Sequence, residues 1–151
     1  MTDRLLVIGV GNRTRCDDGA GPAVLDALAN FDDTAIETIE LAGDCARLID
    51  LWAGRQRVAV VDATKSGAQP GTIFFIDAQA KPVTRDLFIH TSHAFGVAEA
   101  VETARQLERL PDVLTIWGIE GTDCGFGERL TPEVEKSVSD VAVRISQHVH
   151  R

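Results

Sequence analysis

The sequence lacks any apolar run long enough to cross a bilayer, since none approaches the roughly 20 residues that a membrane helix requires. It also lacks a basic surplus: the formal net charge of −8 opposes nucleic-acid binding, which needs a basic face. The first residues carry a short apolar run without the small-residue cleavage site of a signal peptide. We therefore expect a cytoplasmic protein with neither a membrane nor a nucleic-acid partner.

Cysteine is scarce, with three residues (Cys16, Cys45 and Cys124) and no C-x-x-C spacing. An odd, scattered set predicts neither a disulfide framework nor a zinc knuckle. The length of 151 residues fits a single domain, 1–151, whose hydrophobic content of 44% can fill a core without cross-links.

Short apolar runs bounded by glycine, proline or polar residues alternate with segments of helical spacing. The runs predict five strands, at Leu5–Ile8, Ala35–Leu41, Val58–Asp62, Thr72–Ile76 and Val113–Ile119. Four helices are predicted by apolar residues at helical spacing. The first follows Pro22 and has Val24, Leu25, Leu28 and Phe31 inward, and the second has Leu48, Leu51 and Trp52. The third is capped by Ser92 and has Val97, Val101, Ala104 and Leu107 inward, and the fourth follows Thr131-Pro132 and has Val134, Val138, Val141, Ile145 and Val149 inward. Strands alternating with helices predict a three-layer α/β/α domain.

Three of the strands can be placed in the sheet. The alternation in Ala35–Leu41 indicates an edge strand, whereas the uniformly apolar Val58–Asp62 indicates a central one. The segment 64–71 is too short for the crossover of about a dozen residues that parallel neighbours need. The fourth strand is therefore predicted to run antiparallel to the third.

The turn Gly9-Val-Gly11 permits two interpretations. A dinucleotide-binding fingerprint needs a third glycine at position 14, where this chain has Thr14. The alternative, which Thr14 favours, is a tight turn that lets the next loop and helix pack closely. A nucleotide-binding domain is thus retained as a rival hypothesis.

Asp18, Asp62 and His93 are all expected beyond the carboxyl ends of strands, where open α/β sheets bind their ligands. Two carboxylates and one imidazole suit zinc or nickel and leave coordination positions open, or they can activate a water. A helix starting at Ser92 would place His93 in its first turn, where the dipole favours the neutral, metal-binding imidazole.

Each of these residues also has a structural interpretation. One acid of the pair Asp17-Asp18 would satisfy a helix N-terminus, although two adjacent acids repel each other unless a cation or a donor relieves them. Asp62 could accept hydrogen bonds from backbone N–H groups of the next loop. His90 is assigned to the structural alternative.

Short motifs along nearly the whole chain together resemble one known family. They are Gly9-Val-Gly-Asn12 with Asp17-Asp-Gly-Ala-Gly21, Val61-Asp-Ala63, Pro70-Gly-Thr72, Ser92-His93 with Gly96, Trp117-Gly-Ile-Glu120 and Leu130-Thr-Pro132. In this order and spacing they resemble the hydrogenase maturation endopeptidases. The resemblance implies a mixed five-stranded sheet of the phosphorylase/hydrolase-like type, and it places the family's metal ligands on Asp18, Asp62 and His93.

The resemblance also implies an activity: removal of a C-terminal extension from a nickel–iron hydrogenase large-subunit precursor, after nickel insertion. The precursor would supply the nickel, although zinc or another divalent cation could occupy the site. Asp18, Asp62 and His93 would serve both metal binding and catalysis, with Asp18 the candidate to activate water. The main rival is a non-catalytic module that grips the precursor without cutting it.

One loop departs from the family pattern. Many members have a Gly-Gly-Thr-like loop after the second strand, where this chain has Ala42-Gly-Asp-Cys45. Because that loop would border the cleft, we expect it to influence the choice of precursor. Glu40, Asp44 and Glu120 either add negative potential near the mouth of the site or are solvated loop acids.

Overall fold

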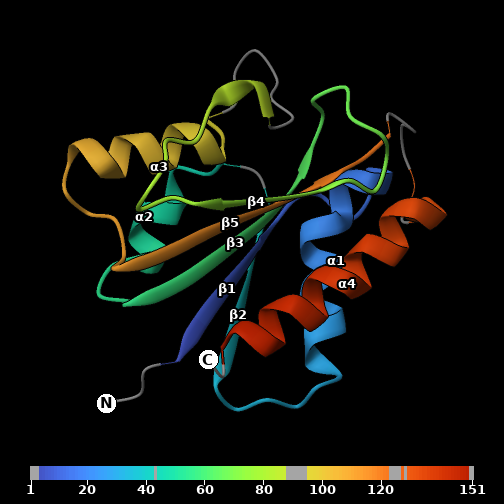
Figure 1. Cartoon of the computed structure of the whole chain (residues 1–151), viewed down its shortest axis with the longest axis horizontal. Helices are drawn as coiled ribbons and strands as arrows, with labels where there is room; N and C mark the ends of the chain where they lie inside the picture. The colour runs from blue at the N-terminus through green and yellow to red at the C-terminus, as the bar shows by residue number, and fades with distance from the viewer. Residues whose placement is uncertain (1–3, 43, 88–94, 123–126, 128, 150–151) are drawn as a thin grey trace.

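The structure, a computed structural model, describes residues 4–42, 44–87, 95–122, 127 and 129–149. In these ranges a five-stranded sheet lies between two layers of helices (Figure 1). The strands are β1 (Leu5–Val10), β2 (Ile36–Leu41), β3 (Arg57–Thr64), β4 (Ile73–Asp77) and β5 (Val113–Glu120). The helices are α1 (Ala20–Ala29), α2 (Arg47–Trp52), α3 (Val97–Gln106) and α4 (Pro132–His148), with short 3₁₀ turns η1 (Cys16–Gly19) and η2 (Arg85–Leu87).

The strand order is β2-β1-β3-β5-β4, which confirms the predicted edge position of β2 and the central position of β3. β1, β2, β3 and β5 are parallel, and β4 alone is antiparallel, as predicted. The neighbour of β4 is β5 rather than β3, however. The crossover through α3 brings β5 back beside β3, so the place next to the central strand is already taken.

Each face of the sheet has its own core. Leu6 and Ile8 of β1 belong to the cluster beneath α2 and α3, whereas Leu5 and Val7 belong to the cluster beneath α1 and α4. Figure 1 shows the same division, with α2 and α3 on one side of the sheet and α1 and α4 on the other. Because alternate side chains of a strand point to opposite faces, a strand buried on both faces is apolar throughout.

Helix α4 follows the prediction most closely. Thr131 precedes it, Pro132 is its first residue, and its inward stripe is buried. Two predicted core residues are instead exposed, Phe31 at 44% and Leu107 at 55%. Both lie beyond the last residue of a helix, and each directly precedes a residue with positive φ, Asp32 or Glu108, which turns the chain away from the helical path.

The start of α3 also differs from the prediction. The helix begins at Val97, and the side chain of Glu99 accepts a hydrogen bond from the backbone N–H of Gly96. The capping residue is therefore not Ser92, which lies outside the described residues. The first turn of α3 contains Val97 and not His93.

Close packing explains the glycines around the first turn. Gly11 has a φ of +147°, and a Cβ atom there would lie 2.0 Å from the carbonyl oxygen of Asp18. A Cβ atom on Gly21 of α1 would lie 2.3 Å from the carbonyl oxygen of Val10 and 2.6 Å from that of Val61. The interpretation of this segment as a tight turn with a closely packed helix is therefore confirmed.

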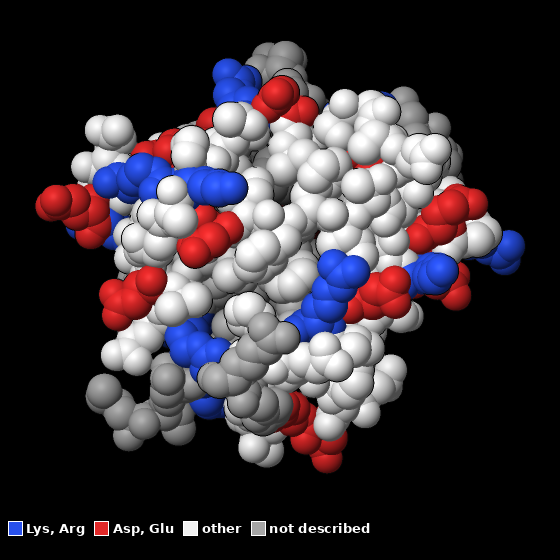
Figure 2. All heavy atoms as spheres, in the orientation of Figure 1, with Lys and Arg blue, Asp and Glu red and all other residues white. Residues whose placement is uncertain are grey.

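Cys16 is disulfide-bonded, a cross-link that the odd and scattered cysteines did not predict. Cys45 is a buried cysteine that forms no disulfide, and Cys124 lies outside the described residues. Among the helices that the structure describes, none is both long and apolar enough to traverse a membrane. On the face drawn in Figure 2, Lys and Arg side chains lie among Asp and Glu side chains rather than in one basic patch.

Candidate active site

The parallel strands β1, β3 and β5 end at one edge of the sheet, and two of the predicted site residues lie there. Asp18 belongs to η1, which follows β1. Asp62 lies near the end of β3, in register with Gly118 of β5. The negative charge of Asp18 contributes to raising the pKa of Asp62, so the two carboxylates are close enough to interact. The predicted convergence of these two acids is thus what the fold produces.

Asp62 is the more deeply buried of the two acids, with 8% of its surface exposed. Its burial, and then the charge of Asp18, raise its pKa well above the ordinary value, and only a hydrogen bond from the Ala63 N–H opposes them. That bond, of 2.8 Å to Oδ1, comes from the adjacent residue. Of the described loop residues after β3, none donates to it, so Asp62 does not anchor that loop.

Asp18 is half-buried, and its burial raises the pKa of its carboxyl group. The charge of Arg15 and the backbone N–H of Asn12 act in the opposite direction without cancelling the rise. Two neighbouring acids with raised pKa values can share a proton or be relieved by a cation. This pair has the electrostatic character of a cation-binding or proton-transferring site.

The adjacent acid, Asp17, has a different role. It is 1% exposed, and its carboxylate accepts hydrogen bonds from the backbone N–H and hydroxyl groups of both Thr122 and Thr131. Neither Asp17 nor Asp18 caps α1, whose N-cap residue Gly19 makes no side-chain cap bond. Of these two adjacent acids, Asp18, the predicted site residue, is the one that remains available to the site.

Glu120 is neither a solvated loop acid nor a free charge at the mouth. It is 2% exposed and accepts hydrogen bonds from the Thr64 hydroxyl, the Ser66 hydroxyl and N–H, and the Gly67 N–H. Burial alone would raise its pKa, but these hydrogen bonds outweigh burial and lower it. Glu120 therefore anchors the loop after β3 as a carboxylate, a role the sequence offered no signal to assign.

Glu40 and Asp44, the other two acids expected near the mouth of the site, lie on β2 and just after it. Glu40 is paired with Arg13 at 2.8 Å, and Arg13 also binds Asp26 of α1 at 2.7 Å. Asp44 is exposed and accepts a hydrogen bond from the Ala46 N–H. Neither carboxylate is a free charge aimed into the site: one is neutralised and the other closes a local turn.

Cys45 brings the departing loop to the site. Burial, followed by the charges of Asp62, Asp44 and Glu99, raises the pKa of its thiol to about 12. Its backbone N–H donates to the carbonyl of Phe95, which lies just before α3. The loop therefore borders the Asp62 side of the site, as expected, and its thiol is neutral rather than a nucleophilic thiolate.

His93, the third predicted site residue, lies outside the described residues, as does His90. The long helix predicted to start after Ser92 begins instead at Val97, so that part of the prediction is wrong. Within the described ranges, no three His, Cys, Asp or Glu side chains group as a metal site. The metal-binding trio therefore remains a prediction.

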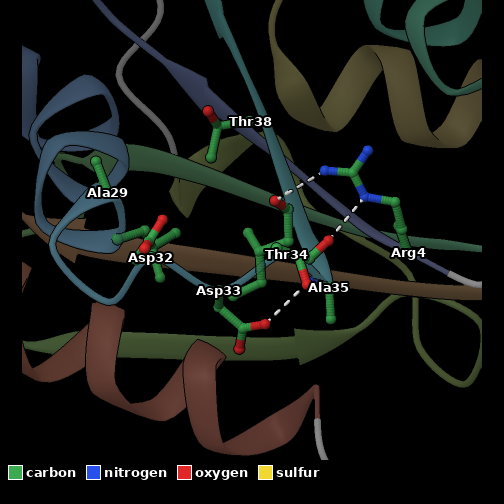
Figure 3. Close-up of a pocket in the computed structure, with 9 residues that line it drawn as sticks. Arg4, Ala29, Asp32, Asp33, Thr34, Ala35 and Thr38 are labelled. Carbon is green, nitrogen blue, oxygen red and sulfur yellow. Dashed lines mark hydrogen bonds between the residues drawn. The ribbon is translucent and has the colours of Figure 1, made fainter.

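A hollow of about 740 Å³ lies elsewhere on the molecule, between the end of α1 and the start of β2 (Figure 3). Arg4 lines it and donates hydrogen bonds to the carbonyls of Thr34 and Ile36, while the Asp33 carboxylate accepts one from the Ala35 N–H. Because Arg4 precedes β1 and Ile36 begins β2, this hollow is at the amino edge of the sheet. It is separate from Asp18 and Asp62.

Comparison with known proteins identifies the family. A sequence model of the hydrogenase maturation proteases matches residues 24–148. The hydrogenase 3 maturation protease of Escherichia coli K12 is 30% identical over 149 residues, covering 96% of this chain and 89% of its own length. The hydrogenase 2 maturation protease of the same strain is 28% identical, covering 89% of this chain and 84% of its own.

Solved structures agree in fold. The hydrogenase maturating endopeptidase HybD from E. coli aligns with a TM-score of 0.79 at 22% identity, over 97% of this chain and 92% of that one. The [NiFe] hydrogenase maturation protease HycI from Thermococcus kodakarensis aligns with a TM-score of 0.75 at 18% identity, over 99% of this chain and 94% of that one. The predicted mixed α/β fold is confirmed, and with the family match over most of its length, this chain belongs to the hydrogenase maturation proteases and is an endopeptidase.

Proposed function

We propose that this endopeptidase removes the C-terminal extension of a nickel–iron hydrogenase large-subunit precursor after nickel insertion, in the cytoplasm. The names of its relatives, maturation proteases of hydrogenases 2 and 3, support this class of substrate. The observation that carries the chemistry is the pair Asp18 and Asp62, two acids with raised pKa values at the carboxyl edge of the sheet.

The chemistry of this pair suits a divalent cation brought by the substrate. Asp62 is buried and, from the described residues, receives one hydrogen bond, so its ionised form has little compensation. A cation bound beside it would supply the missing positive charge. Asp18, Asp62 and His93 would hold nickel that the precursor already carries, and carboxylate and imidazole ligands also suit zinc.

The described residues favour water as the attacking group. The thiol of Cys45, which the charge of Asp62 reaches, is held neutral by burial and by the surrounding acids. The more exposed Asp18 is the better candidate to accept a proton from water, because it can exchange that proton with solvent, whereas Asp62 is enclosed. Asp62 would then serve mainly to bind and orient.

The test compares three substrates by intact mass: nickel-loaded precursor, metal-free precursor and a peptide spanning the extension junction. We expect shortening of the nickel-loaded precursor alone. Efficient cutting of the metal-free precursor would contradict recognition of nickel. Stable binding of the loaded precursor with no loss of mass would instead support the non-catalytic rival.

Matched variants connect the assay to the site. Asp18→Asn and Asp62→Asn should each abolish shortening, whereas Asp50→Asn, an exposed acid on α2, should leave it unchanged. The cytoplasmic location is tested by cell fractionation. Fractionation is informative here because Cys16 is disulfide-bonded, and disulfides are uncommon in cytosolic proteins.

A further inference from the structure

The carboxylate of Asp17 has a hydrogen-bonding arrangement that the proposed chemistry does not use. Oδ1 accepts from the Thr131 N–H at 2.8 Å. Oδ2 accepts from the Thr122 N–H at 2.9 Å, the Thr122 hydroxyl at 2.8 Å and the Thr131 hydroxyl at 2.9 Å. These four charge-assisted bonds stabilise a carboxylate that is 1% exposed.

The partners come from elements far apart in sequence. Thr122 follows the end of β5, and Thr131 directly precedes α4. Asp17 therefore joins η1 to two other elements at the carboxyl edge of the sheet. The contact is close, since a Cβ atom on Gly121 would lie 2.8 Å from the Cβ atom of Asp17.

The neighbours of Asp17 are held in other ways. The Asp18 N–H donates to the carbonyl of Arg15, and the Asn12 N–H donates to the carbonyl of Asp18, both at 3.1 Å. These are backbone bonds, and they fix the path of the chain at Asp18. Cys16, the first residue of η1, is held by its disulfide. Asp17 is therefore the side-chain anchor that lies directly beside Asp18.

We infer that Asp17 is a positioning residue, which holds η1 so that the carboxyl group of Asp18 faces Asp62. In a turn of four residues, fixing one side chain fixes the direction of the next, because successive Cα–Cβ directions are coupled through the backbone. The effect of Asp17 on cleavage rests on the proposed function. Its effect on the geometry of η1 does not.

The informative variant is Asp17→Asn, which keeps the shape of the side chain. The amide nitrogen donates and cannot accept, so one of the four donors, such as the Thr131 N–H, loses its acceptor. We expect amide hydrogen exchange at Asn12 and Asp18 to quicken by about tenfold or more, while exchange in β3 follows global stability alone. We also expect kcat for nickel-loaded precursor to fall about 10- to 100-fold, with KM nearly unchanged.

Ser137→Ala is the matched control. Ser137 is a buried residue of α4 whose hydroxyl donates to the carbonyl of Gly71, so the variant loses a buried hydrogen bond without touching η1. It should lower the melting temperature while leaving kcat and the exchange at Asn12 and Asp18 as in the parent. Thr122→Val removes one hydroxyl donor and keeps the Asp17 carboxylate. It should change kcat and the exchange at Asn12 and Asp18 in the same direction as Asp17→Asn, by a smaller amount. It replaces Asp17→Asn in the test if that variant does not fold.

The outcomes separate the two hypotheses. Unchanged exchange at Asn12 and Asp18 in both Asp17→Asn and Thr122→Val overturns the positioning role, whatever the activity. Equal losses of kcat in Ser137→Ala would also overturn it, because the effect would then be one of stability. If the parent protein fails to shorten the precursor, the proposed function is wrong, and the exchange rates still decide the role of Asp17.

Discussion

Replacing Asp62 by asparagine should stabilise the protein at neutral pH while weakening metal binding. The asparagine side chain would retain a carbonyl oxygen that accepts the Ala63 N–H, and its near-identical volume leaves no cavity. What disappears is a buried negative charge that lies near the charge of Asp18. An acid that is costly to the fold yet placed at the site is the expected pattern for a functional residue.

The size of the effect follows from the raised pKa. The folded-state pKa of Asp62 is above its ordinary value of 3.8, so the folded protein holds this proton to higher pH than the unfolded chain does. The stability it contributes is complete below about 3.8 and is lost as pH rises through the folded-state pKa. Within that window one proton corresponds to about 1.4 kcal/mol per pH unit, or about 3–5 °C in Tm for a chain of this length.

The assay is a pair of thermal melting series, run from pH 4 to pH 8 with a chelator present. The Tm of the parent should fall relative to that of Asp62→Asn as pH rises through the window, and the two curves should run parallel above it. Asp18→Asn should show a weaker form of the same behaviour, because Asp18 is only half-buried and solvent screens its charge. Titration with zinc or nickel(II) should then show at least about tenfold weaker binding to Asp62→Asn, since a charged ligand has been lost.

Two results would refute this reasoning. Parallel Tm curves over the whole pH range would mean that Asp62 titrates in the folded protein as it does in the unfolded chain. A Tm for Asp62→Asn well below that of the parent at pH 7 would mean that the carboxylate supports the fold. In that case the metal-binding trio would lose its most buried member.

Three further predictions concern the histidines, the loop 42–45 and the packing of α1. Metal affinity should rise as pH passes through about 6.5, where histidine loses its proton; His93→Ala should flatten this dependence and His90→Ala should not, and the reverse result would exchange their roles. Replacing the loop 42–45 by Gly-Gly-Thr-like residues should change the preferred precursor and spare metal affinity, and loss of metal binding would instead make the loop a source of ligands. Gly21→Ala should lower stability by at least about 1–3 kcal/mol in chemical denaturation, because its Cβ would meet backbone carbonyls of β1 and β3; an unchanged midpoint would contradict the tight packing of α1.

Much of the fold was predictable because its signals are local. Apolar runs with glycine or polar ends predicted all five strands, and the start of α4 was readable from Thr131-Pro132. The edge and central positions of β2 and β3 followed from how many faces each strand buries. Helix ends were less predictable, and α3 begins at Val97 because the Glu99 side chain caps the N–H of Gly96.

The convergence of Asp18 and Asp62 also followed from the sequence. Both acids come after apolar runs, and parallel strands carry such residues to one edge whatever the details of packing. The family resemblance agreed with this placement through motifs around both residues, and the comparisons confirmed the family.

The sequence by itself determined which strands form and which edge of the sheet bears the acids, because these depend on hydrophobic patterning within a few residues. Only the tertiary structure decided which acids remain available for chemistry. Asp17 and Asp18 are neighbours of the same type, yet donors from Thr122 and Thr131, more than 100 residues away, satisfy one and leave the other. Likewise, the hydrogen bonds that fix Glu120 come from Thr64, Ser66 and Gly67, brought beside it by the pairing of β3 and β5. Whether a carboxylate is an anchor or a reactive group depends on the donors around it, and those donors are assembled by the fold.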